Sequence, residues 1–268
     1  MNPIDALFQL IPSHTAAEFS ISLILCILLA LFAYLRGILD SSGSLAAFTI
    51  GIVIAIFGNI YWLLTLISFL IVTFIVTKLG FSNKQSKGVA QGKHGERNAR
   101  NVLANGMLPA LIPILIPWLG WKVTGLLFIV CISEAASDSF ANEVGVLSDK
   151  AYLITNLRKR VKAGTHGGIS VQGELAGLAG AIIPATFGWV LISEYNKSLI
   201  PITDIAQMPM TAMTLVLPIL LGFLGCHIDS VLGATLQLKK LISNDTVNFL
   251  SITFTFIIAI IIISLIGL

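Results

Sequence analysis

Repeated apolar runs of roughly 18 or more residues, each long enough to cross a hydrocarbon core about 30 Å thick as one helix, constrain the fold of this chain more than any other feature. Only 11% of the residues are charged and the mean hydropathy is +0.94, whereas soluble domains carry about 25% charged residues. The sequence therefore predicts an all-α, polytopic transmembrane helical bundle with about eight spans, within a range of about seven to nine. The apolar runs cover residues 17–38, 41–58, 60–79, 101–119, 121–140, 171–193, 211–230 and 247–267.

The basic residues are distributed unevenly around these spans. Fourteen of the sixteen Lys and Arg residues fall on one side of the predicted topology, and only Lys122 and Lys197 fall on the other. Basic loops of membrane proteins face the cytoplasm, so we expect this side to be cytoplasmic and both termini to lie outside. The inner segments are then residues 37–44, 80–100, 141–170 and 231–246.

One integral-membrane domain, residues 1–268, is the simplest organisation of the chain. No repeat relates its two halves, and no low-complexity linker separates a soluble part. The span 101–119 contains three prolines, so we expect its helix to be kinked or broken. Cys26, Cys131 and Cys226 are isolated in apolar runs, and we expect them to be packing residues rather than disulfide partners or metal ligands.

The first polar segment leads from the second inner loop into the fourth span. Arg97, Asn101 and Asn105 are spaced i, i+4, i+8 and so share one helical face. A guanidinium and two amides at a helix N-terminus suit the oxygens of a phosphate, and we expect Lys93 and Arg100 to add positive charge. The alternative is structural: the asparagines bond neighbouring helices and the arginine reaches lipid phosphate.

The second polar segment lies at the inner end of the fifth span, where Glu134 is expected roughly 9 Å inside the membrane boundary. Glu134, Asp138 and Asn142 share a helical face, and Glu143 follows them. Carboxylates one turn apart can hold Mg²⁺ while waters and substrate phosphates fill its other positions. We therefore predict Glu134, Asp138 and Glu143 as metal ligands, the first two also as catalytic residues. A structural network with arginines or an ion-translocation site would explain the same residues.

Glycines and hydrogen-bond donors are concentrated just before the sixth span. Gly164, Gly167 and Gly168 leave backbone N–H groups open at a helix N-terminus, which suits an anion. No Walker A pattern occurs, so we do not expect a P-loop. Tight helix packing through small residues is the alternative interpretation. The side chains expected to bind nucleotide phosphates with this turn are Lys162, Thr165, His166 and Ser170.

The inner end of the seventh span places Asp229, Gly233 and Gln237 on one helical face. Asp229 could complete the metal site with Asp138, or it could only cap a helix and pair with a basic loop. We favour the first interpretation, which makes Asp229 a metal ligand and catalytic residue and Gln237 a substrate contact. Residues 244–248 predict an N-capping turn into the last helix.

Taken in order, the segments NARNVLANG, SDSFANEVGVLS, GTHGGISVQGELAG and GCHIDSVLGATLQ, followed by NDTVN, resemble one family from about residue 36 onward. The chain is similar to the integral-membrane family of transmembrane protein 19 and plant phytyl-phosphate kinase. Asp138 to Ala141, followed by Gly164-Thr165-x-Gly167, also resembles the pattern of CTP-dependent phytol and dolichol kinases. Glu174 stands where the family often has a small or hydroxyl residue, so we expect it to matter less than Asp138.

The resemblance implies a kinase that converts an isoprenyl monophosphate, of phytyl or geranylgeranyl type, into the diphosphate. It also implies a nucleoside triphosphate donor, CTP in first place, and Mg²⁺ as cofactor. Arg97 then joins Asp138, Glu134 and Asp229 as a catalytic residue, and the active site faces the cytoplasm. No nucleic-acid partner is expected, and the oligomeric state is open. The rival functions are an ion- or proton-coupled transporter that uses the intramembrane carboxylates, and a structural membrane protein.

Overall fold

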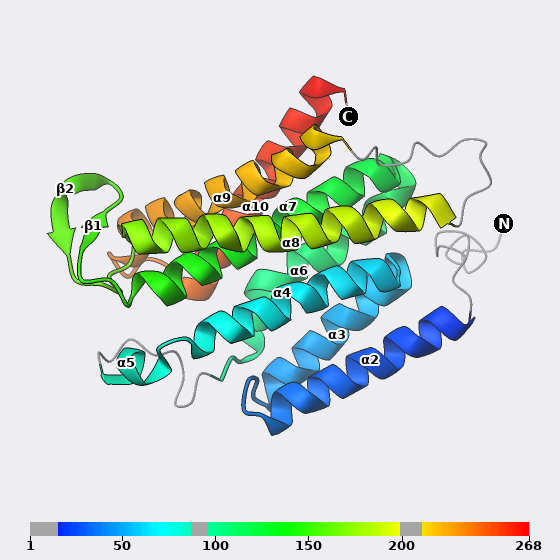
Figure 1. The fold of residues 1–268 in the computed structure, drawn as a ribbon, viewed down its shortest axis with the longest axis horizontal. Helices are drawn as coiled ribbons and strands as arrows, with labels where there is room; N and C mark the ends of the chain where they lie inside the picture. Colours follow the sequence, from blue (N-terminus) through cyan, green and yellow to red (C-terminus); the bar gives the residue numbers. More distant parts are fainter. Residues whose placement is uncertain (1–15, 87–95, 199–210, 268) are drawn as a thin grey trace.

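Long helices lie side by side along the longest axis of the molecule (Figure 1). The computed structural model describes residues 16–86, 96–198 and 211–267. The predicted all-α membrane fold is confirmed by these residues. Their helices are α2 (Ala16–Leu35), α3 (Ser41–Phe57), α4 (Ile60–Lys78), α5 (Phe81–Ser86), α6 (Ala99–Leu111), α7 (Ile116–Gly145), α8 (Val171–Ser198), α9 (Ala212–Leu232) and α10 (Asn244–Ile266).

The described helices cover the eight predicted spans, but one of these spans is a short helix and two others form one continuous stretch. Ser41–Phe57 is an apolar helix of only 17 residues. The 47-residue stretch Ala99–Gly145 holds two predicted spans, because Gly120 (φ 74°, ψ 163°) bends the chain between them. Six stretches of the described chain are long and apolar enough to cross a membrane: Ala17–Leu35, Ile60–Lys78, Ala99–Gly145, Val171–Ser193, Ala212–Gln237 and Asn244–Ile266.

The break expected in the fourth span occurs at its prolines. α6 ends at Leu111, a 3₁₀ turn covers Ile112–Leu115, and α7 begins at Ile116. Pro113 and Pro117 each lie within the first two residues of the 3₁₀ turn and of α7. The missing backbone N–H of proline costs least at that position, so the sequence divides the helix where it tolerates proline.

α7 is the central helix of the bundle. Its side chains from Leu126 to Asp138 are all buried, because α4, α8, α9 and α10 pack around it. Trp62 of α4 packs on Phe128, with the ring centroids 4.8 Å apart. Gly225 of α9 lies so close to α7 that a Cβ there would overlap the side chain of Glu134. The close approach of two helices thus encloses a carboxylate in the core.

The inner segment 141–170 contains a small antiparallel sheet that the sequence analysis did not predict. Its strands β1 (Ala151–Leu153), β2 (Asn156–Val161) and β3 (Gly168–Ile169) are arranged in the order β2-β1-β3. β1 has only three residues and β2 is almost entirely exposed. Neither strand therefore shows the alternation of apolar and polar residues by which a strand is recognised in a sequence. The sheet and α5 lie at one end of the bundle, whereas α2 starts and α10 ends at the other (Figure 1).

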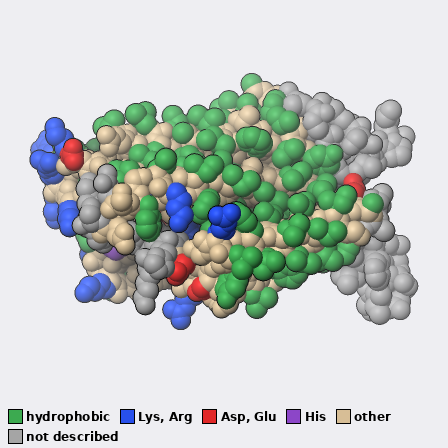
Figure 2. Space-filling view, turned by 60° about the horizontal axis from the view of Figure 1, so that its bottom comes forward, with side chains coloured by type: hydrophobic (Ala, Val, Ile, Leu, Met, Phe, Trp, Pro, Cys, Tyr) green, Lys and Arg blue, Asp and Glu red, His purple; other side chains and the backbone are tan. Residues whose placement is uncertain are grey.

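The surface is divided in the same way. Figure 2 shows hydrophobic side chains over most of one face and a group of Lys and Arg side chains at the end that carries the sheet. Arg158, Lys159 and Arg160 of β2 are exposed there. An apolar belt with a basic end is typical of a helical membrane protein. The cytoplasmic orientation of this end stays a prediction.

Candidate active site

A polar cavity of about 530 Å³ lies beside the small sheet, with Ala151 of β1 and Gly168 of β3 among its lining residues. Its lining comes from the start of α6, the end of α7, the turn before β3 and the end of α9. These are the four polar segments that the sequence analysis singled out, and the fold brings them together. The predicted site residues in the lining are Arg97, Asn101, Gly164, Thr165, His166, Gly167, Gly168, Asp229 and Gln237.

The backbone of Arg97 is held by the loop that precedes α3. Its N–H donates to the Ile38 carbonyl at 2.9 Å, and its own carbonyl accepts from the Asp40 N–H at 3.1 Å. A Cβ on Gly43 would overlap the Arg97 carbonyl, so this approach requires glycine. Asp40 also accepts from the Gly43 N–H at 2.7 Å, which lowers the pKa of its carboxyl. The inner loop 37–44 therefore positions Arg97.

The prediction of one shared helical face is confirmed for Asn101 and Asn105 but was wrong for Arg97, which pairs with Leu39 in a β-bridge before Asn98, the N-cap of α6. Together with Asp138, the arginine and the two asparagines Asn101 and Asn105 line a small cavity of about 20 Å³ beside the polar one. The Asn105 side chain donates to the Asn101 carbonyl at 2.9 Å and accepts from the Asn248 amide at 3.4 Å. Burial lowers the pKa of the Arg97 guanidinium, and nearby carboxylates of α7 act in the opposite direction. The guanidinium thus lies within the electrostatic field of those carboxylates.

Asp138 and Asp229 form a carboxylate pair where α7 and α9 meet. Their side chains lie within hydrogen-bonding reach of each other, and both are buried, with 7% and 9% of their surface exposed. Asn142 donates to Asp138 Oδ1 at 2.8 Å. Within the described residues no Lys or Arg forms an ion pair with either carboxylate. Two carboxylates this close require a cation or a proton between them.

Glu134 lies one helical turn deeper than Asp138. Its Oε1 accepts from the Ser251 hydroxyl at 2.7 Å, and that hydroxyl lies 3.4 Å from Asp229 Oδ2. Its Oε2 is buried without a partner among the described residues. Because α7 continues to Gly145, past the predicted end of the span, Glu134 lies about 16 Å from the end of the helix. Its depth in the membrane stays a prediction.

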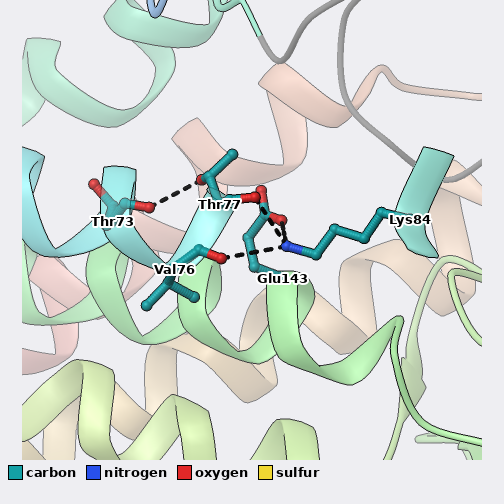
Figure 3. Close-up of polar contacts among 5 residues, drawn as sticks. All are labelled: Thr73, Val76, Thr77, Lys84 and Glu143. Atoms are coloured by element: carbon teal, nitrogen blue, oxygen red, sulfur yellow. Dashed lines mark hydrogen bonds and ion pairs between the residues drawn. The ribbon is translucent and has the colours of Figure 1, made fainter. Parts of the chain in front are cut away.

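Glu143 has a cation of the protein as its partner. Lys84 Nζ lies 2.5 Å from Glu143 Oε2 and donates to the carbonyls of Thr77 at 3.1 Å and Val76 at 3.3 Å (Figure 3). The three N–H groups of the ammonium thus have three acceptors. The two charged side chains are only 2% and 8% exposed. Glu143 is therefore a weaker candidate for a metal ligand than the Asp138–Asp229 pair.

The glycine-rich turn packs against the end of α9. Gly164 and Gly167 have φ values of +85° and +71°, which only glycine adopts without steric cost. A Cβ on Gly167 would overlap the backbone of Ala234. Ala234 lies in a π-helical turn, Gly233–Gln237, that continues α9, and π-helical turns are frequent at functional sites. The turn before β3 and this π-helical turn both line the polar cavity.

Three of the predicted contacts that the structure describes lie elsewhere. Ser170 is buried and accepts hydrogen bonds from the backbone at the start of α8 and from Ser148, so its hydroxyl supports the helix. Lys162 and Arg100 are exposed and do not line the polar cavity. Lys93 lies outside the described residues.

The residues present fit a magnesium ion. Mg²⁺ binds one or two carboxylates and completes its coordination with water and substrate phosphates, and the Asp138–Asp229 pair offers two. The unpartnered Glu134 Oε2 is one more buried acceptor nearby. No three His, Cys, Asp or Glu side chains of the described chain form a preformed metal cage. The metal role of Glu134, Asp138, Glu143 and Asp229 stays a prediction.

Sequence reasoning missed Ser251, Lys84 and the role of loop 37–44. Ser251 follows Asn248 by three residues, so their common helical face could have revealed it. Lys84 gave no signal, because its partner is 59 residues away in the sequence. The capping turn expected at residues 244–248 belongs to α10 itself, and the N-cap is Ser243, one residue earlier.

The fold and the cavity define a class: a helical membrane protein with carboxylates, an arginine and a glycine-rich turn gathered at one end of its bundle. The chain belongs to the family described as integral membrane protein DUF92, which matches residues 24–256. No solved structure matches it.

Individual relatives extend over most of the chain. An uncharacterized membrane protein of Methanocaldococcus jannaschii is 30% identical over 89% of this chain and 91% of its own length. Protein PGR of Arabidopsis thaliana is 30% identical over 90% of this chain and 96% of its own length. Protein VTE6, chloroplastic, of the same plant is 30% identical over 83% of this chain and 64% of its own length.

Proposed function

We propose that this protein is a kinase that transfers the terminal phosphoryl group of a nucleoside triphosphate, CTP in first place, to an isoprenyl monophosphate of phytyl or geranylgeranyl type. The polar cavity carries the proposal. In it an arginine and a glycine-rich turn, which suit phosphates, lie near a buried carboxylate pair that has no Lys or Arg partner in the described chain. Transfer between two phosphates needs both anion-binding groups and a cation site.

The sequence motifs support the same reaction. The segments that resemble the family of plant phytyl-phosphate kinase are those whose residues line the polar cavity. The relatives in Arabidopsis thaliana are similar over more than four fifths of this chain. The resemblance therefore covers the cavity and the helices that form it.

Each group of the cavity has a distinct task in the proposed reaction. Arg97 and Asn101 bind the phosphate of the acceptor, and the turn 164–168 binds nucleotide phosphates through its backbone N–H groups. Asp138 and Asp229 would hold Mg²⁺, which neutralises charge on the transferred phosphoryl group when bound. The protein then accelerates transfer mainly through positioning and charge stabilisation.

The acceptor needs no general base. A phosphomonoester oxygen is already nucleophilic at neutral pH, unlike the oxygen of a free alcohol. It forms a bond to the terminal phosphorus while the bond from that phosphorus to the bridging oxygen breaks, and the nucleoside diphosphate leaves. No proton has to move, so the buried carboxylates are not required as bases.

The test is a transfer assay with purified protein, Mg²⁺, γ-labelled CTP, ATP, GTP or UTP, and phytyl or geranylgeranyl phosphate. We expect labelled lipid diphosphate, most of it with CTP, and none after chelation of the metal. Absence of labelled diphosphate with every pair would contradict the kinase. Ion flux in proteoliposomes without any transfer would instead favour the transporter.

A further inference from the structure

An apolar groove meets the polar cavity at the start of α6. Side chains of α2, α3, α4 and α6 line it, and hydrocarbon groups dominate the lining away from one polar end. Arg97 and Asn101 line both the groove and the polar cavity. The groove therefore ends at the arginine and the amide that suit a phosphate.

The length of the groove matches one leaflet of a bilayer. Its lining on α4 runs from Leu66 to Lys78, about 18 Å at 1.5 Å per residue. This is slightly more than half of a hydrocarbon core about 30 Å thick. A chain that lies in the groove would extend from the membrane surface to about the middle of the bilayer.

The groove offers few polar contacts along this length and is open to lipid. Thr73 donates its hydroxyl hydrogen to the Phe69 carbonyl at 2.8 Å. Thr77 donates to the Thr73 carbonyl at 2.9 Å (Figure 3). The hydroxyl hydrogens are thus used within α4. Phe32 and Leu70 border the groove and are 49% and 43% exposed, so a chain can enter from the side.

We propose that this groove holds the hydrocarbon chain of the phosphorylated lipid, with its phosphate at Arg97 and Asn101. Charge complementarity selects the head group, because Arg97 and Lys78 border the groove and no carboxylate does so in the described chain. A single-chain amphiphile with a compact phosphate satisfies both the apolar wall and the basic end. The isoprenoid identity of the chain rests on the proposed function; the groove itself does not.

The first test is photolabelling, which needs no turnover. Geranylgeranyl phosphate with a diazirine at the end of its chain is bound to the full-length protein without nucleotide, irradiated, and located by peptide mapping. We expect labelled peptides from α2, α3 and α4, and competition by unlabelled geranylgeranyl phosphate but not by geranylgeraniol. Labels confined to α8, α9 and α10 would overturn the proposal.

A pair of neighbouring substitutions on α2 sharpens the test. Ala33 lines the groove, whereas Tyr34 does not line it and is 50% exposed. Ala33→Trp should fill the groove and reduce labelling and the affinity for the lipid phosphate about tenfold, and Tyr34→Trp should leave both unchanged. Equal behaviour of two folded variants would count against the groove. If Ala33→Trp does not fold, labelling of the unmodified protein still decides.

The two proposals fail in different ways. Groove labelling without transfer of phosphate to the lipid would keep the groove and refute the kinase. Transfer with a KM for geranylgeranyl phosphate that Ala33→Trp does not change would keep the kinase and refute the groove. In the expected result, Ala33→Trp raises this KM about tenfold and leaves the KM for the nucleotide unchanged.

Discussion

Two buried charge clusters lie five residues apart on α7 and are balanced in different ways. Glu143 is paired with Lys84, whose ammonium also caps two carbonyls at the end of α4. Asp138 faces Asp229, and no Lys or Arg of the described chain forms an ion pair with either. One cluster is neutral within the protein, whereas the other needs a cation or a proton from outside. The source of the compensating charge, rather than burial, separates the structural carboxylate from the carboxylates that are proposed to be functional.

The largest effect is expected from Asp138→Asn. The substitution keeps the shape of the side chain but removes a charge from the Asp138–Asp229 pair. Turnover should therefore fall by about 10³-fold, which is the effect of losing a central electrostatic contact. The thermal unfolding temperature in detergent should not fall, because like-charge repulsion with Asp229 is relieved. Phosphoryl transfer and unfolding are measured on the same preparation, with Glu174→Gln as the control. Near-normal turnover of the variant would remove Asp138 from the metal site.

Lys84→Met tests the Lys84–Glu143 pair and should lower stability rather than turnover. It leaves Glu143 buried without its cation, which costs about 3 kcal/mol. The double variant Lys84→Met/Glu143→Leu replaces the pair with apolar groups and should regain most of that stability together with turnover. Unfolding by denaturant in detergent and the transfer assay provide the two readouts. A stable but inactive double variant would show that Glu143 belongs to the catalytic cluster after all.

Arg97→Gln tests the arginine that is proposed to bind the phosphate of the acceptor near the Asp138–Asp229 pair. Its guanidinium is expected to form charge-assisted hydrogen bonds with phosphate, worth about 2 kcal/mol. The KM for the lipid phosphate should rise about thirtyfold while kcat falls less, and stability should change little. Arg97→Lys should recover only part of the loss, because an ammonium cannot bind two oxygens in a fixed plane. Full recovery by lysine would reduce the role of Arg97 to that of a point charge.

The sequence predicted the parts of this structure that helix geometry determines. Bilayer thickness imposes the length of each span, and a period of 3.6 residues places Asn101 and Asn105 on one face of α6. It fails for Arg97, because the helix begins only after Asn98 and Arg97 is extended. The distance between Asp138 and Asp229, on separate helices, depends on packing that no local pattern encodes. The same holds for Lys84 and Glu143. The sequence could therefore predict which residues share a helical face, but not which charged residues of different helices lie together.

The last comparison is between side-chain and backbone contacts with phosphate. Gly167→Ala introduces a Cβ against the Ala234 backbone at a φ of +71°, a conformation that costs other residues roughly 1–2 kcal/mol. Since the turn is proposed to bind the nucleotide through backbone N–H groups, we expect the KM for the nucleotide to rise about tenfold. The KM for the lipid phosphate should not change. Steady-state kinetics with each substrate varied in turn measures both.

Gly267→Ala is the matched control for this prediction. Gly267 also has a positive φ, +68°, but its Cβ would meet no atom within 4 Å. The control therefore carries the backbone strain without the overlap, and it lies outside the polar cavity lining. If both variants lose nucleotide affinity equally, strain and lower stability explain the effect. If only Gly167→Ala loses nucleotide affinity, the loss comes from the displaced turn. The nucleotide then binds at this turn rather than at the carboxylates of α7.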